Sequence, residues 1–213
     1  MRPAIGVPFQ TKSRLVARGV ITLHGAIRNK LAPFASQLLF RLDAIEASTP
    51  LMVRVGIGYD SHKFGEGGPL KLGGVDIPFD RHLVGHSDGD AIAHAITDAI
   101  LGAAGAGDIG ELFSDRDPAN RGRDSIEMLG AAVDRVKATG YGVAQVDVTV
   151  VAEAPRLAPH REAMRLALAR ALDIGTAAVS IKGKTNEGMG WIGRGEGIAC
   201  IAVATLAPNE DRR

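Results

Sequence analysis

The sequence is poor in several features that would point to particular classes of protein. A single cysteine, Cys200, cannot form an intramolecular disulfide, so a secreted disulfide-stabilised scaffold is excluded. Only 4% of the residues are aromatic and the net charge is +1, which argues against nucleic acid as a partner. The longest apolar stretches, such as residues 199–207, are far shorter than the roughly 20 residues of a membrane-spanning helix. We therefore expect a cytoplasmic protein that binds neither nucleic acid nor membrane.

The composition that remains is typical of a glycine-rich α/β enzyme. The chain has 213 residues, 46% of them hydrophobic, 23% charged and 27 of them glycine, which suits one domain, with or without an appendage. Residues 1–42 carry seven basic and no acidic residues, which leaves 18 basic against 24 acidic residues in the remainder. This basic segment is interpreted as part of a dispensable extension, residues 1–51, ahead of a domain at residues 52–213. An organelle import signal is the alternative.

Hydrophobic periodicity predicts that strands and helices alternate after residue 52. Strands are expected at residues 53–57, 146–152, 179–184 and 197–206, with a glycine-rich hairpin within 65–78. Helices are expected at residues 87–104 and 124–139 and after Pro159. The order predicts a single compact α/β domain of the α+β type, with a mixed sheet packed by helices.

The first candidate site is Asp60-Ser61-His62, expected at the end of the first strand. Residues i and i+2 of an extended segment point to the same side, so the carboxylate and the imidazole could bind one metal ion. A surface pair or a hydrogen bond at the strand end is the more common role of such a motif.

The second candidate site lies at the predicted start of the helix at residues 87–104. Ser87 and Asp90 have the spacing of a capping box, so the first helical N–H groups are expected to face a nearby anion, with His86 at that entrance. Asp90, His94 and Asp98 share one side of the helix. They form either a solvated face or a metal ligand supported by two carboxylates. Together with Asp60 and His62, His94 would complete three ligands of an open, catalytic type of zinc site.

Two further loops have compositions that suit a polar or phosphorylated substrate. Residues 108–118 form either an ordinary acidic loop or a set of contacts to a polyhydroxyl compound. Residues 182–197 combine glycines with Lys182, Lys184 and Arg194, so backbone N–H groups and cations could approach phosphate. Glu187 in this loop could bind a hard divalent cation. A tight structural hairpin is the alternative for residues 193–197.

Taken together, these segments resemble the 2-C-methyl-D-erythritol 2,4-cyclodiphosphate synthase family over about residues 53–207. The resemblance rests on Asp60-x-His62, residues 86–90 (HSDGD), His94, residues 108–110 (DIG), Ala154-Pro155 and residues 193–197 (GRGEG). It implies a homotrimer with an active site at each subunit interface. The implied reaction converts 4-diphosphocytidyl-2-C-methyl-D-erythritol 2-phosphate to the cyclic diphosphate and CMP, in the non-mevalonate route to isoprenoids. Residues 1–51 are too few for the cytidylyltransferase domain that some relatives carry, so we expect a monofunctional chain.

The resemblance also implies roles for individual residues. It implies zinc at Asp60, His62 and His94, and magnesium or manganese at Glu187, bridging the diphosphate. His86 and Thr185 match transition-state stabilisers. The implied substrate contacts are Asp60, Ser61, His62, His86, Ser87, Asp108, Ile109, Gly110, Phe113, Ser114, Asp115, Arg116, Asp117, Ala152, Glu153, Ala154, Pro155, Arg156, Leu157, Ala158, Lys184, Thr185, Asn186, Glu187, Trp191 and Arg194.

Four positions depart from the usual family pattern, namely Ser114, Lys184, Asn186 and Trp191. They affect the expected loop geometry and leave every implied metal and stabiliser position filled. Two other functions remain open at this point. One is a zinc-dependent phosphohydrolase, in which metal-bound water attacks. The other is a trimeric sensor that binds an isoprenoid diphosphate in an axial cavity near Arg194 and Glu196.

Overall fold

The computed structural model describes residues 52–209, and the predictions made for residues 1–51 lie outside the described residues. Five strands form one mixed sheet in the order β4-β1-β7-β5-β6. Only β5 and β6 pair in parallel, and the other neighbours are antiparallel. The strands are β1 (Arg54–Glu66), β4 (Arg81–Leu83), β5 (Tyr141–Val151), β6 (Val179–Lys184) and β7 (Gly197–Pro208), with a separate hairpin of β2 (Leu70–Leu72) and β3 (Val75–Ile77).

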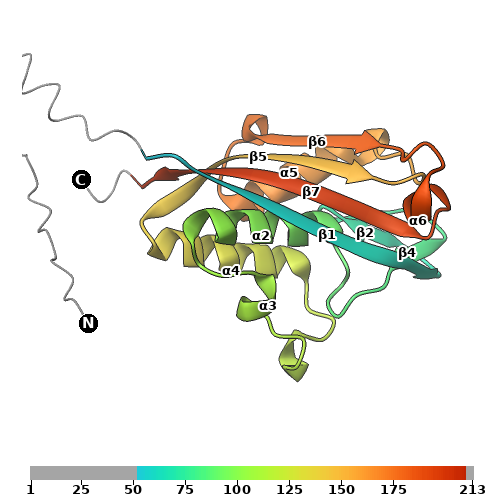
Figure 1. Ribbon diagram of the computed structural model, residues 1–213, viewed down its shortest axis with the longest axis horizontal. Coiled ribbons are helices and arrows are strands. Elements are labelled where there is room, and N and C mark those ends of the chain that lie inside the picture. The colour runs from blue at the N-terminus through green and yellow to red at the C-terminus, as the bar shows by residue number, and fades with distance from the viewer. Residues whose placement is uncertain (1–51, 210–213) are drawn as a thin grey trace, which may run out of the picture. The chain divides into compact units, whose positions relative to one another are not determined.

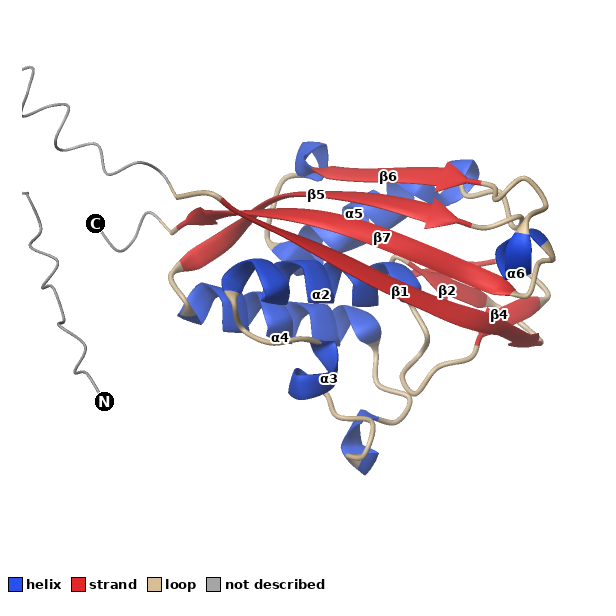
Figure 2. Cartoon of the chain, viewed as in Figure 1, coloured by secondary structure: helices blue, strands red, loops and turns tan. Residues whose placement is uncertain are grey.

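Three longer helices pack on one face of the sheet (Figure 1). They are α2 (Ala91–Ala104), α4 (Ser125–Ala138) and α5 (Arg161–Leu172), and short helices α3 (Ile109–Leu112) and α6 (Gly190–Gly193) lie in the connecting loops (Figure 2). Three 3-10 turns complete the set: η1 (Pro118–Asn120), η2 (Ala158–His160) and η3 (Thr176–Ala178). The predicted mixed sheet packed by helices is confirmed. In the described part of the chain, no helix is both long and apolar enough to cross a membrane.

The two faces of the sheet have different surroundings. On β7, Cys200, Ala202 and Ala204 point toward the helices and are fully buried. The alternate residues of β1 and β7 point away from the helices, and none of the described helices covers them. These outward side chains are large, apolar and 39–71% exposed, and we call them the outer apolar face: Val55, Ile57, Tyr59, Ile201 and Val203.

Two glycines of β1 allow α2 to lie directly on the sheet. A Cβ atom at Gly58 would overlap the carbonyl oxygen of Ala95, and one at Gly56 would overlap that of Ala99. Side chains alternate along a strand, so Gly56, Gly58, Asp60 and His62 all face the helix. The close approach of the two backbones therefore brings the Asp60-x-His62 motif next to α2.

Most predicted elements are present, with two corrections. Helix α4 begins and ends where expected, because the carboxylate of Asp124 caps its first turn through Ile126 N and Glu127 N. Strand β1 does not end at Ile57, so Asp60-Ser61-His62 lies inside a strand, where Asp60 pairs with Cys200 and His62 with Ile198 on β7. The expected helix at residues 87–104 begins at Ala91 instead, and its N-cap is Asp90, not Ser87.

Candidate active site

Three potential metal ligands meet where β1 passes α2. Asp60 Oδ2 lies 2.9 Å from His62 Nε2 and 3.0 Å from His94 Nδ1. The two ring nitrogens are 3.2 Å apart. Among the described residues, these three side chains are the group with metal-binding geometry. Ser61, between Asp60 and His62 on the strand, is exposed and points to the opposite side of the sheet.

The ring nitrogens of both histidines that face away from Asp60 have hydrogen-bond partners of their own. His62 Nδ1 lies 2.9 Å from the carbonyl oxygen of Val84, which can only accept, so Nδ1 carries a proton and Nε2 is the nitrogen that presents a lone pair when the ring is neutral. His94 Nε2 lies 2.9 Å from both Ser87 Oγ and Ser125 Oγ. Ligands of a tetrahedral ion with bonds of about 2.0–2.1 Å are separated by roughly 3.3 Å. The three atoms are therefore spaced nearly as a metal ion requires.

Electrostatics in the metal-free protein point the same way. Burial acts to raise the pKa of Asp60, but hydrogen bonds from His62 and His94 outweigh it and hold the pKa of that carboxyl well below its usual range. Burial acts to lower the pKa of His62, but the hydrogen bond and charge of Asp60 outweigh it and raise the pKa above 6.5. The site thus favours positive charge between the carboxylate and the imidazoles, which a divalent cation would supply.

Two alternatives were open for Asp90, His94 and Asp98, a solvated face or a metal ligand supported by two carboxylates. Neither holds as stated, because Asp90 and His94 are buried and both carboxylates bind backbone N–H groups. Asp90 is fully buried, and its carboxylate accepts hydrogen bonds from Gly73 N, Gly74 N, Ile92 N and Ala93 N at 2.6–3.1 Å. Asp98 accepts one from Ile109 N at 2.8 Å. Because Asp90 itself uses the first N–H groups of α2, the expectation that they would face a bound anion is also wrong.

A pocket of about 150 Å³ opens beside the three potential ligands. Of the predicted site residues it is lined by Asp60, His62, His86, Ser87, His94, Ile109, Gly110, Phe113 and Asp115. Asn120 and Met128 also line it and were missed. Asn120 is a buried amide whose Nδ2 donates to the Ser114 carbonyl oxygen at 2.9 Å and so holds the loop that carries Phe113. No local sequence pattern predicts this role, because the contact joins two turns of an irregular loop.

Other predicted contacts in residues 108–117 have local structural roles and do not line this pocket. The carboxylate of Asp108 caps α3 through Glu111 N at 2.8 Å. Asp117 caps the turn at Pro118–Asn120 through Ala119 N at 3.0 Å. Ser114 Oγ accepts from Arg116 N at 3.3 Å, and the Arg116 side chain is exposed. These contacts shape the loop around Phe113 and Asp115.

A second pocket, of about 210 Å³, lies at the carboxyl ends of the parallel strands β5 and β6. Its lining contains eight predicted residues: Ala152, Glu153, Pro155, Arg156, Leu157, Ala158, Lys184 and Thr185. Val150, Gly183 and Arg161 complete it, and Arg161 is a charged residue that sequence reasoning missed. The crevice outside the carboxyl ends of parallel strands is a common place for nucleotide binding.

The loop that follows β6 is held by Glu153. Its Oε1 accepts from Asn186 N at 2.9 Å and from Gly188 N at 3.3 Å. Thr185 Oγ1 donates to Glu187 Oε1 at 3.0 Å, and Glu187 adopts a left-handed backbone with φ of 51°. The predicted residues Asn186, Glu187, Trp191 and Arg194 line neither pocket. Within one chain, His86 and Thr185 therefore belong to different pockets.

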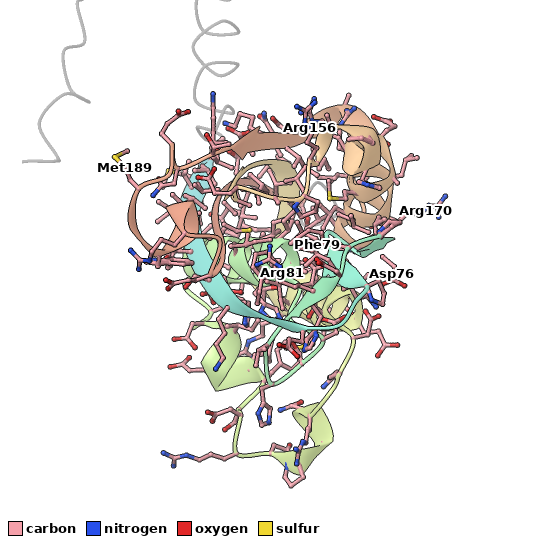
Figure 3. The ribbon with its side chains drawn as sticks, turned by 90° about the vertical axis from the view of Figure 1, so that its right-hand side faces the viewer. Asp76, Phe79, Arg81, Arg156, Arg170 and Met189 are labelled. Atoms are coloured by element: carbon pink, nitrogen blue, oxygen red, sulfur yellow. The ribbon has the colours of Figure 1, made fainter. Side chains whose placement is uncertain are left out.

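Arg81 fixes the turn that contains Arg194 and Glu196. Its Nη1 donates to the carbonyl oxygen of Gly195 at 2.8 Å, and its guanidinium lies 4.3 Å above the ring of Phe64 and 5.0 Å above that of Phe79. Figure 3 looks onto this end of the molecule, where Arg81 and Phe79 lie close together, with Met189 on the loop to one side and Arg156 above. Arg194 Nε donates to Glu196 Oε1 at 2.6 Å on the exposed side of the turn.

Comparison with known proteins gives consistent results. Residues 53–207 match the model of the YgbB family. The 2-C-methyl-D-erythritol 2,4-cyclodiphosphate synthase of Gemmatimonas aurantiaca is 63% identical over 73% of this chain and 94% of its own length, and that of Escherichia coli O6:K15:H31 is 52% identical over 72% and 97%. A synthase structure in a CDP-bound form is 40% identical over 72% of this chain and 99% of its own, with a TM-score of 0.67. The bifunctional IspDF of Campylobacter jejuni is 41% identical over 76% of this chain, with a TM-score of 0.74, but the match spans 44% of that longer protein.

Proposed function

The chain belongs to the YgbB family of 2-C-methyl-D-erythritol 2,4-cyclodiphosphate synthases, and from this premise we propose that Asp60, His62 and His94 bind the metal ion used in its reaction. The chain converts 4-diphosphocytidyl-2-C-methyl-D-erythritol 2-phosphate to 2-C-methyl-D-erythritol 2,4-cyclodiphosphate and CMP. The observation that carries the proposal is the meeting of these three side chains at the wall of a pocket. The phosphohydrolase and sensor alternatives are not favoured by any relative.

The chemistry is an intramolecular phosphoryl transfer. An oxygen of the 2-phosphate forms a bond to the β-phosphorus, and the bond from that phosphorus to the oxygen bridging the α-phosphate breaks. CMP leaves with the bridging oxygen and the electron pair, so no water is consumed. Such a reaction asks the protein to position two phosphates and to neutralise their charge.

Zinc suits the proposed site because two neutral imidazole nitrogens and one carboxylate are a common donor set of catalytic zinc. When bound, the ion would act as a Lewis acid on a phosphoryl oxygen. The chain's part is to hold the three ligand atoms 2.9–3.2 Å apart, with the Nδ1 proton of His62 directed at the carbonyl oxygen of Val84. His86 and Ser87 line the pocket beside these ligands, where they would contact a phosphate.

The second cation and the nucleotide would use the other group of residues. We assign magnesium or manganese to Glu187, whose carboxylate is exposed and oriented by Thr185. The cytidine diphosphate part would occupy the second pocket, supported by the cations of Lys184, Arg156 and Arg161 in its lining. Thr185 in that lining would contact a phosphate of the substrate and stabilise the transition state.

A homotrimer would join the two halves of the active site. Residues near the metal ligands and residues of the nucleotide pocket line separate cavities of one chain, so we propose that neighbouring subunits complete each site. The outer apolar face supports this assembly, because Ile57 and Tyr59 are 71% and 56% exposed. Ile57→Asp is expected to give a folded monomer by analytical ultracentrifugation, and a stable trimer of this variant would place the interface elsewhere.

The same assembly would create a cavity on the trimer axis. We assign an isoprenoid diphosphate to it as a bound ligand, with Arg194 near the diphosphate. The exposed Arg194–Glu196 pair on the turn held by Arg81 supports this assignment. Arg194→Ala should then abolish binding of farnesyl diphosphate in calorimetry, and unchanged binding would remove Arg194 from that site.

Phosphorus NMR tests the reaction, and metal analysis tests the site. Purified protein, first quantified for zinc, is incubated with the diphosphocytidyl substrate and magnesium. Two coupled signals of a cyclic diphosphate that appear together with CMP are the expected result. Acyclic products would instead favour hydrolysis. A zinc content near zero in a fully active protein would overturn the assignment of Asp60, His62 and His94.

A further inference from the structure

A hydrogen-bonded chain of side chains continues inward from the metal-facing imidazole of His94. His94 Nδ1 faces Asp60 and His62, while its Nε2 lies 2.9 Å from Ser125 Oγ. Ser125 is fully buried at the start of α4, and its Oγ donates a short hydrogen bond to Asp88 Oδ1. Neither Ser125 nor Asp88 is part of the site described above.

The polarity of this chain is determined by the carboxylate at its end. A hydroxyl group has one proton, and a carboxylate can only accept, so the proton of Ser125 is committed to Asp88. Toward His94, the oxygen of Ser125 can then only accept. His94 must therefore carry its ring proton on Nε2, which leaves the lone pair of Nδ1 directed at the metal position.

Asp88 is itself held in place by several contacts. Its Oδ2 accepts from the backbone N–H of Ser125 at 3.2 Å and lies 3.4 Å from Lys71 Nζ. Lys71 also donates to Asp124 at 3.0 Å, so strand β2 and the N-terminus of α4 both restrain the carboxylate. Ser87 Oγ is as close to His94 Nε2 as Ser125 Oγ is, but its hydrogen bonds in the structure do not include a carboxylate.

We propose that Ser125 and Asp88 are positioning residues for the metal site, which lock the tautomer and the ring orientation of His94. This inference rests on the proposed assignment of Asp60, His62 and His94 as metal ligands. A ligating histidine commonly donates its second N–H to such a partner, and the loss of the partner weakens metal affinity about 10–100-fold.

The test measures zinc affinity of the metal-free full-length chain by competition with a chromophoric chelator. Ser125→Ala removes the acceptor, and Asp88→Asn offers an amide N–H to Ser125 Oγ, which would turn the hydroxyl proton toward His94 Nε2. Both variants are expected to bind zinc about 10–100-fold more weakly than wild type. Because Ser125 and Asp88 act in series on His94, their effects should not add. The zinc affinity of the double variant should equal that of whichever single variant binds zinc more weakly.

Thr97→Val is the matched control. Thr97 is fully buried on α2, one turn beyond His94, and its hydroxyl donates to the Ala93 carbonyl oxygen at 2.8 Å and not to a metal ligand. This variant also loses one buried hydroxyl, but its zinc affinity should equal that of wild type. The visible absorption of the cobalt-substituted proteins provides a second readout, since it reports coordination geometry. It should change in Ser125→Ala and stay the same in Thr97→Val.

Three results would overturn the inference. These are wild-type zinc affinity in Ser125→Ala, an equal loss in Thr97→Val, or additive losses in the double variant. If Ser125→Ala fails to fold, Asp88→Asn alone decides, with wild-type affinity counting against the proposal. Absence of zinc binding in the wild-type chain would be a different failure, because it would remove the metal site itself.

Discussion

Gly58→Ala tests whether the close approach of β1 and α2 builds the metal site. The added Cβ would lie 2.7 Å from Ala99 N and would overlap the carbonyl oxygen of Ala95. Both are backbone atoms of α2, so no side-chain rotation can relieve the contact. Ordinary contact begins at 3.4 Å, and the helix must therefore withdraw from the strand by at least 0.7 Å near Ala99.

Two consequences follow from a displacement of this size. Overpacking of a tight interior costs about 1–3 kcal/mol. At about 2–4 °C per kcal/mol for a chain of this length, the melting temperature should fall by roughly 2–12 °C. His94 moves with α2, while Asp60 and His62 stay with β1. Because binding sites tolerate only about 0.5 Å of misplacement, zinc affinity should fall about tenfold or more.

Gly102→Ala is the matched control, since the same substitution is made on α2 where nothing lies within 4 Å of the new Cβ. It should raise stability by about 0.4–1 kcal/mol by restricting the unfolded chain. Thermal melts of metal-free protein at one concentration, combined with chelator competition for zinc, measure both effects. If Gly58→Ala is as stable as Gly102→Ala and binds zinc with wild-type affinity, then β1 and α2 do not pack as described.

Three further perturbations test the role of His94, the pH dependence of stability and the N-terminal segment. His94→Ala should abolish zinc binding and turnover while the chain still folds, and stoichiometric zinc in this variant would remove His94 from the ligand set. In the metal-free protein, Asp60 and His62 should contribute most to stability between about pH 4 and 6.5. The lowered pKa of Asp60 adds stability above 3.8 that is lost on acidification, and the raised pKa of His62 adds stability below 6.5 that is lost as the pH rises past that pKa. A difference in melting temperature between wild type and Asp60→Asn that does not change with pH would contradict this. Deletion of residues 1–51 should leave activity and assembly intact, which turnover and sedimentation of the shortened chain would check.

The sequence predicts best those features that depend on neighbours along the chain. Helix α4 is an example, because Asp124 caps it through residues two and three positions later. Local apolar patterns also predict strands β6 and β7. The end of β1 was misplaced since Asp60, Ser61 and His62 carry no apolar signal. Pairing with β7, more than 130 positions away in the chain, keeps them extended.

Contacts between distant segments explain the other errors. Asp90 lies four positions before His94, a spacing that places both on one side of a helix. Its carboxylate instead accepts hydrogen bonds from Gly73 N and Gly74 N of the β2–β3 hairpin. No local pattern in the sequence shows that the β2–β3 hairpin contacts the N-cap of α2. Ser125 was overlooked for the same reason, because its contacts with Asp88 and His94 span 37 and 31 positions of the chain.

The sequence nevertheless contains one signal for the metal site. Gly56, Gly58, Asp60 and His62 alternate along one strand, so two positions without side chains precede two potential ligands on the same face. Glycine on the buried face of a strand marks a close approach by another backbone. The two potential ligands must therefore lie beside whatever element packs on the glycines. That element is α2, and His94 lies in its first turn. The close packing that Gly56 and Gly58 permit therefore also brings the three potential ligands together.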